Sequence, residues 1–260
     1  MSWVPGLCSV TFRQLSPVQI VERAAAAGLR AIEWGTDVHA PPGDLARARE
    51  LASLCHSAGL ACPTLGSYAR ATASARSQPW SPLLDTAEAL GATTVRIWAG
   101  ESGFAETDNR TRHDVADAVR NYAESASARG LKIALEYHPD TLTDCRRGAA
   151  WLLEQVAHPA LKSYWQPVPD QPVEDCRDDL DALGEHLAHL HMFFWRGERI
   201  RYPLSEGGAY WARILNGRRV PRGGHAFLEF VPGDDPACLG REAAALLQLL
   251  GPEADPGVHQ

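Results

Sequence analysis

The sequence predicts a single (β/α)8 barrel, a closed ring of eight parallel strands surrounded by helices. Three observations lead to this fold class. A boundary made of an alanine-rich helical stretch, a glycine and a short β-rich run recurs along the chain. Eight short apolar or β-branched runs alternate with helical stretches. The length of 260 residues is typical of one such barrel.

The recurring boundary marks the end of each helix. It appears as AAAAGLRAIEW, CHSAGLACPTL, AEALGATTVRIW and SARGLKIALEY, with Gly28, Gly59, Gly91 and Gly130 at the junctions. Glycine just past a helix end takes the left-handed backbone conformation without a steric penalty. The glycines are 31, 32 and 39 residues apart, a spacing typical of one βα unit.

The eight expected strands follow these boundaries. They are LCSVTF (7–12), AIEWG (31–35), ACPTLG (61–66), TVRIWAG (94–100), KIALEYH (132–138), KSYWQPV (162–168), LAHLHMFFW (187–195) and AFLEFV (226–231). Because right-handed crossovers join parallel strands, eight such units close into a barrel. An open doubly wound sheet is the alternative, but its glycine-rich phosphate loop is absent from the first turn, TFRQLSP. We expect residues 1–251 to form one barrel domain and residues 252–260 to be a disordered tail.

Three helices begin with a capping residue followed by proline. Ser16-Pro17 is followed by Gln19, which completes a capping box. Ser81-Pro82 repeats the cap and proline, and Asp235-Pro236 precedes the last helix. These pairs predict where helices start.

Composition limits the class of partner. A net charge of −7 argues against nucleic acid or an anionic membrane as the main partner, since both call for a basic face. No apolar run approaches the ~20 residues that a membrane helix needs, and the N-terminus does not resemble a signal peptide. The six cysteines are scattered without a C-x-x-C pair, which favours reduced side chains in a cytoplasmic protein.

Polar and aromatic residues gather where the expected strands end, which is where a (β/α)8 barrel has its active site. They are Glu33, Trp34, Asp37 and His39 for the second strand, Ser67, Tyr68 and Arg70 for the third, Arg96 and Trp98 for the fourth, Glu136 and His138 for the fifth, Trp165 and Gln166 for the sixth, His189 and His191 for the seventh, and Glu229 for the eighth. Such a concentration predicts a polar site at this end of the barrel.

Glu136 and Glu229 are the central candidates. Glu229 lies inside the apolar run AFLEFV, where an unpaired carboxylate is costly to bury. A metal ion is the simplest way to satisfy both glutamates at once. Other interpretations stay open: each glutamate as a salt-bridge partner, His189 as a hydrogen-bonded structural residue, and the tryptophans as core residues rather than surfaces that stack on a sugar ring.

The chain resembles the xylose-isomerase-like barrel superfamily, specifically its sugar phosphate isomerases and epimerases. The resemblance covers nearly the whole chain and implies one divalent metal ion (Mn, Mg, Zn or Co), held by Glu, Asp, His and Glu. It places Glu136 of LEYHP, His191 of HLHMFFW and Glu229 of FLEFV at three ligand positions. Gln166 of YWQPV stands where the family has aspartate, which leaves two carboxylates instead of three.

The resemblance also implies a reaction and a pocket. Glu136 and Glu229 would act as the acid/base pair around a metal-stabilised enediolate. The expected substrate contacts are His39, Tyr68, Arg96, Trp98, His138 and Trp195. A second departure is the loss of the family's H-x-K-D, replaced here by the run 192–195, MFFW.

We therefore expect a metal-dependent isomerase or epimerase acting on a small carbohydrate, either a sugar, a sugar phosphate or a related polyol. A lyase or dehydratase on a keto-sugar, inosose or sugar conjugate is the main alternative, since it uses the same enolate chemistry. A binding protein with a degenerate site is a further alternative. An endonuclease IV-like repair enzyme is disfavoured by the acidic charge and the sparse ligands. Relatives are often dimers or tetramers, which leaves a homo-oligomer open.

An arginine-rich segment, RGERIRYPLSEGG, follows the seventh expected strand. Barrels often bind phosphate near strands seven and eight. Arg196, Arg199 and Arg201 would then hold an anionic group of the substrate; the alternative is a solvated basic loop.

Overall fold

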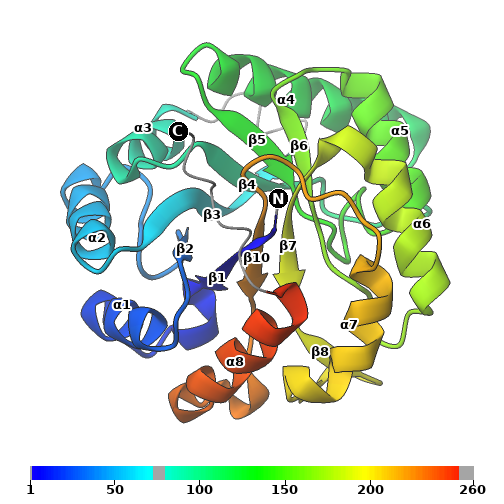
Figure 1. The fold of residues 1–260 in the computed structure, drawn as a ribbon. Helices are drawn as coiled ribbons and strands as arrows, with labels where there is room; N and C mark the ends of the chain where they lie inside the picture. Colours follow the sequence, from blue (N-terminus) through cyan, green and yellow to red (C-terminus); the bar gives the residue numbers. More distant parts are fainter. Residues whose placement is uncertain (1, 73–79, 252–260) are drawn as a thin grey trace, which may run out of the picture.

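The computed structural model describes residues 2–72 and 80–251 and shows a closed barrel (Figure 1). Its strands follow the order β1-β10-β7-β6-β5-β4-β3-β2, and each pairs in parallel with its neighbours. The helices lie around the outside of this ring. The predicted single (β/α)8 barrel is confirmed.

The elements have the following bounds. The barrel strands are β1 (Val4–Cys8), β2 (Ala31–Gly35), β3 (Ala61–Ala71), β4 (Thr94–Ala99), β5 (Lys132–Leu135), β6 (Leu161–Trp165), β7 (Leu187–Met192) and β10 (His225–Leu228). The α-helices are α1 (Pro17–Ala26), α2 (Leu45–Ser57), α3 (Ser81–Leu90), α4 (Asn109–Ser127), α5 (Arg146–Val156), α6 (Val173–Leu183), α7 (Gly208–Leu215) and α8 (Leu239–Leu250). Among the described residues, no helix is long and apolar enough to cross a membrane.

The strand bounds differ from the prediction in several places. The fifth, sixth and eighth strands end before Glu136, Gln166 and Glu229, and two further differences change the local structure. The first strand starts earlier, at Val4, and residues 9–12 form a 3-10 helix. Gly6 lies within this strand, and a Cβ there would lie 2.5 Å from the Phe227 ring, so this glycine lets β10 pack closely. The seventh strand ends at Met192, and the arginine-rich segment beyond it forms a hairpin.

This hairpin pairs β8 (Phe194–Arg196) with β9 (Ile200–Tyr202) in antiparallel fashion. It is a separate two-stranded sheet between β7 and α7, so the basic segment is an ordered arm rather than a loop. The expected tail 252–260 lies outside the described residues.

The glycine boundaries are confirmed. Gly28, Gly59, Gly91 and Gly130 all have a positive φ, between 72° and 78°. L-residues rarely adopt this conformation, so glycine ends the helix and turns the chain back toward the next strand at low cost.

The interior of the barrel contains a small apolar cluster below the polar site. Its buried members are Cys8, Val10, Ala31, Ala134, Tyr164 and Phe227. Side chains two residues apart along a strand share a face. Glu136 and Glu229 therefore lie on the same inward face as Ala134 and Phe227, one layer closer to the carboxyl ends of the strands.

The two Ser-Pro pairs differ in the structure. Ser16 accepts a hydrogen bond from the backbone N–H of Gln19, whose side chain accepts one in return from Ser16 N–H, so the predicted capping box is confirmed. Ser81 is instead the first residue of α3 and makes no cap hydrogen bond; it donates to Asp85. Asp235 caps only a short 3-10 turn before α8.

This difference is testable by alanine substitution. We expect Ser16→Ala to lower the free energy of unfolding by about 1 kcal/mol, because a helix cap is lost. Ser81→Ala is the matched control and should change it by less than about 0.5 kcal/mol. Urea denaturation followed by circular dichroism measures both values. Equal losses in the two variants would contradict the assignment.

Candidate active site

A buried arginine lies between two glutamates inside the barrel. Arg96 of β4 is 2% exposed, and its Nε lies 3.3 Å from Glu33 Oε1 of β2. Its Nη1 donates to Glu136 Oε2, just beyond β5. Burial opposes the charge on Arg96, but the two carboxylates outweigh this effect and hold its pKa well above the usual value. Arg96 therefore ties together residues from three strands.

A second group converges on His191 of β7. Its Nδ1 lies 2.9 Å from Gln166 Oε1, 3.3 Å from Glu136 Oε1 and 3.4 Å from Glu229 Oε2. The potential ligand atoms of the two glutamates and the histidine all lie within 4.8 Å of one another. The four residues expected from the sequence to bind a metal are thus brought together.

The two glutamates of this group differ in their environment. Glu136 Oε2 accepts hydrogen bonds from Arg96 and, at 2.5 Å, from Trp98 Nε1. Burial alone would raise its pKa, but the charge of Arg96 lowers the pKa of Glu136 to about 2. Burial raises the pKa of Glu229 to about 7, since the positive charge of His191 opposes it only in part. Glu136 is a fixed anion, whereas Glu229 is the less stabilised carboxylate.

The group opens into a cavity of about 560 Å³ at the carboxyl ends of the strands. Glu136, Gln166 and Glu229 line its floor, while His191 is fully buried behind them. Five of the six residues expected to contact substrate also line it: Tyr68, Arg96, Trp98, His138 and Trp195. The His138 ring stacks on Trp98 with centroids 4.7 Å apart, which gives the cavity one flat aromatic wall.

His39 is the exception and is a correction to the expected contacts. Its ring is buried away from the lining of the cavity, with Nδ1 3.1 Å from Ser9 Oγ and Nε2 3.2 Å from the Leu15 carbonyl. Both nitrogens are occupied, so His39 joins the segment after β1 to the segment after β2. The sequence shows that His39 lies shortly after a strand, but not that its ring packs against Ser9 and Leu15 instead of facing the cavity.

The tryptophans divide between core and cavity. Trp34 and Trp165 are fully buried in the main hydrophobic core, which agrees with the interpretation of the tryptophans as core residues. Trp98 and Trp195 line the cavity. His189 lies lower in the barrel, where its Nδ1 accepts the backbone N–H of His225.

Arginines line the mouth of the cavity. Arg13 pairs with Asp37 at 2.5 Å, and Arg201 pairs with Asp234. Arg199, at the turn of the β8–β9 hairpin, lines the cavity with no acidic partner among the described residues. Arg196 points elsewhere, 3.5 Å from Asp170.

Comparison with known proteins agrees with this architecture. A curated relative, the 3-dehydroshikimate dehydratase of Bacillus anthracis, is 30% identical over 103 residues, which cover 37% of this chain and 35% of that protein. The match therefore spans about a third of the relative's length.

Solved structures are similar over almost the whole chain. The probable 3-DHS dehydratase involved in petrobactin synthesis from Bacillus anthracis has a TM-score of 0.72 at 21% identity, with 95% of this chain and 98% of that chain covered. D-psicose 3-epimerase, solved in the presence of D-fructose, has a TM-score of 0.64 at 15% identity, with 95% and 97% covered. A barrel from Mycobacterium smegmatis in complex with magnesium has a TM-score of 0.64 at 15% identity, with 95% and 96% covered.

The family profile described as "Xylose isomerase-like TIM barrel" matches residues 21–199. This match covers more than half of the chain and agrees with the closed barrel. The chain belongs to the xylose isomerase-like TIM barrel family.

Proposed function

We propose that the protein is a metal-dependent dehydratase that removes water from a small cyclic hydroxy-ketone carrying an anionic group. The observation that carries the proposal is the convergence of Glu136, Glu229 and Gln166 on Nδ1 of His191 at the floor of the cavity. Such a donor set suits a divalent cation, which when bound would supply positive charge to the carbonyl oxygen of a substrate.

The formal charges of the buried cluster fit this ion. Three carboxylates, Glu33, Glu136 and Glu229, face a single guanidinium, that of Arg96, and all four residues are at most 5% exposed. A metal-bound His191 is neutral, and the three carboxylates, when ionised, would then exceed the guanidinium by two negative charges at the floor of the cavity. Buried charge of this kind is costly unless it is paired. One divalent ion among the carboxylates would neutralise it.

The hydrogen bonds assign different roles to the two glutamates. Glu136 Oε2 is held by Arg96 and Trp98, so this carboxylate is fixed in place and suits a ligand. Glu229 has no such donors: its Oε2 faces His191 at 3.4 Å, and its side chain lines the cavity. We therefore assign Glu229 as the base that takes the proton from the carbon next to the carbonyl.

Tyr68 is the residue best placed to assist the leaving hydroxyl. Its hydroxyl oxygen accepts a hydrogen bond from Arg13 Nη2 at 2.5 Å, which leaves its own proton free to donate into the cavity. Burial raises the pKa of Tyr68 to about 12, so the phenol keeps this proton at neutral pH. Loss of hydroxide from the neighbouring carbon, with this proton added to it, releases water.

Arg199 favours an anionic substrate. Since Arg13, Arg96 and Arg201 all have acidic partners, Arg199 is the cavity-lining arginine of the described chain with a guanidinium left for a ligand. The relative's substrate, 3-dehydroshikimate, is a cyclic hydroxy-ketone with a carboxylate. Both observations place dehydration ahead of the epimerisation of a neutral sugar.

Epimerisation, the reaction expected first from the sequence, is the second candidate function. Its support is the pair Glu136 and Glu229, which lie together beside Nδ1 of His191. An epimerase returns a proton to the opposite face of the same carbon, and this role requires Glu136 to exchange protons while it is bonded to Arg96 and Trp98. These bonds stabilise the anionic form of Glu136 and so oppose its protonation. An elimination needs no proton from Glu136, and this favours dehydration over epimerisation.

The metal is tested directly. We expect elemental analysis of the purified protein, reconstituted with Mn, Mg, Zn or Co, to find one divalent ion per chain. Glu136→Gln and His191→Ala should each weaken metal binding at least about tenfold, as measured by calorimetry. Glu106→Gln is the matched control, because Glu106 lines the cavity outside the ligand group. A wild-type protein that binds none of these metals would remove the basis of the proposal.

The reaction is tested with two substrates. Wild-type protein at saturating metal should convert 3-dehydroshikimate to an aromatic product, followed by ultraviolet absorbance, and should not epimerise D-psicose. Glu229→Gln should lower kcat by about 10²–10⁴-fold, because the base is lost. Exchange of a substrate proton with deuterium from solvent, without loss of water, would favour the second candidate.

The anionic group is tested at the hairpin. We expect Arg199→Ala to raise KM for the carboxylate substrate about tenfold with kcat little changed, because a charged hydrogen bond to a part of the substrate remote from the reaction is lost. Arg196→Ala lies on the same hairpin and should leave KM unchanged. Equal effects of the two substitutions would argue for a general effect on the hairpin.

A further inference from the structure

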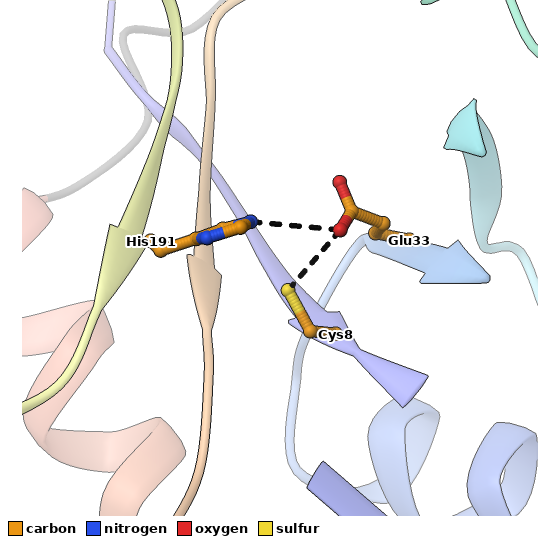
Figure 2. A group of neighbouring side chains, drawn as sticks. All are labelled: Cys8, Glu33 and His191. Carbon is orange, nitrogen blue, oxygen red and sulfur yellow. Dashed lines mark hydrogen bonds and ion pairs between the residues drawn. The ribbon is translucent and has the colours of Figure 1, made fainter. Parts of the chain in front are cut away.

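Glu33 faces the side of His191 that points away from the proposed metal. Figure 2 shows one carboxylate oxygen of Glu33 in contact with both a ring nitrogen of His191 and the sulfur of Cys8. Its Oε1 lies 3.5 Å from Nε2 and 3.7 Å from Cys8 Sγ. The ring of His191 thus has carboxylates on both sides: Glu136 and Glu229 at Nδ1, and Glu33 at Nε2.

We propose that Glu33 is a positioning residue, which accepts the Nε2–H of His191 and so holds the Nδ1 lone pair toward Glu136 and Glu229. This inference rests on the proposed metal function. A neutral imidazole carries one N–H, so a ring that binds a cation through Nδ1 must carry its proton on Nε2. That N–H lies in the barrel interior and needs an acceptor.

His191 is fully buried, and its Nε2 makes no hydrogen bond within the described part of the chain. The carboxylate oxygen that faces it is Glu33 Oε1, at 3.5 Å. Cys8 and Tyr164 are further polar neighbours, but the Cys8 thiol donates to Glu33 Oε1 and the Tyr164 hydroxyl also interacts with Glu33. Glu33 is therefore the acceptor that a proton on Nε2 would use once a metal ion occupies the Nδ1 side.

The surroundings hold the carboxylate in place. Glu33 Oε2 accepts from Thr64 Oγ1 at 3.0 Å, and Oε1 lies 3.3 Å from Arg96 Nε. Gly66 provides the space: a Cβ there would lie 2.6 Å from Glu33 Oε1 and 3.1 Å from Arg96 Nη2. Gly66 therefore leaves room for the Glu33 carboxylate and the Arg96 guanidinium, and a larger residue there would displace them.

A second metal ion is the competing use of this group, since Cys8, Glu33 and His191 also present ligand atoms within 4.8 Å of one another. The guanidinium of Arg96 opposes it. A cation bound to Glu33 Oε1 would sit beside a buried positive charge that already pairs with that oxygen. We therefore assign one ion, on the Nδ1 side of the ring.

The test is zinc binding by the full-length protein. We expect Glu33→Gln to weaken zinc affinity about 10- to 100-fold by calorimetry, because a neutral amide is a poorer acceptor for the Nε2–H. Cys8→Ala removes the other neighbour of Glu33 and should stay within about twofold of wild type. Gly66→Ala keeps the charge of Glu33 but displaces its carboxylate, and should weaken binding in the same direction.

A proton spectrum separates positioning from a merely structural role. In the zinc-loaded wild type, the Nε2–H of His191 should give a downfield, slowly exchanging resonance, typical of an imidazole bonded to a carboxylate. This signal should be lost or move upfield in Glu33→Gln and persist in Cys8→Ala.

The outcomes are distinct. Folded Glu33→Gln and Gly66→Ala proteins with wild-type zinc affinity would overturn the inference and leave the proposed function standing. Two zinc ions per chain, with one lost on Cys8→Ala, would overturn it in favour of the second site. A wild-type protein that binds none of Zn, Mn, Mg and Co would overturn both the inference and the proposed function.

Discussion

The site depends on one buried ion pair network, that of Arg96 with Glu33 and Glu136. A guanidinium that is 2% exposed is tolerated only while its counter-charges are in place, and removal of one partner from such a pair typically costs about 3–5 kcal/mol. Because Glu33 lies in β2, Arg96 in β4 and Glu136 directly after β5, the network fixes one side of the barrel mouth. It also determines which carboxylates remain free to do chemistry.

The network makes the two central glutamates unequal. Glu136 receives Arg96 and Trp98 on one oxygen, which favours its anion, whereas Glu229, across the barrel on the β10 side, receives neither. Two glutamates that follow equivalent strands therefore have pKa values shifted in opposite directions: that of Glu136 is lowered and that of Glu229 is raised. The contrast arises from the packing of β4 beside β5 and supports an assignment of base and ligand that the sequence alone left open.

Features that depend on local sequence could be predicted, whereas features that depend on side-chain contacts between distant segments were missed. The glycine boundaries need only a left-handed residue after a helix, so the βα repeat could be read directly. The convergence of Glu136, His191 and Glu229 was inferred by resemblance, because their contacts span 38 to 93 residues. His39 was misplaced, since nothing local shows that its ring bonds to Ser9. The role of Glu33 was missed because it depends on Gly66 and Arg96, on other strands.

Glu33 also accounts for the departure at Gln166. In the ligand set that the resemblance implies, Gln166 replaces an aspartate and leaves one carboxylate fewer. Glu33 adds a third buried carboxylate behind His191, and Arg96 offsets one of the three. With His191 neutral as a metal ligand and the carboxylates ionised, the cluster would carry the two negative charges that a divalent ion neutralises. An aspartate in place of Gln166 would leave an additional unpaired negative charge beside Glu229, which burial already disfavours as an anion. The amide supplies an oxygen to the site without this cost, so Gln166 is consistent with a functional metal centre built around Arg96.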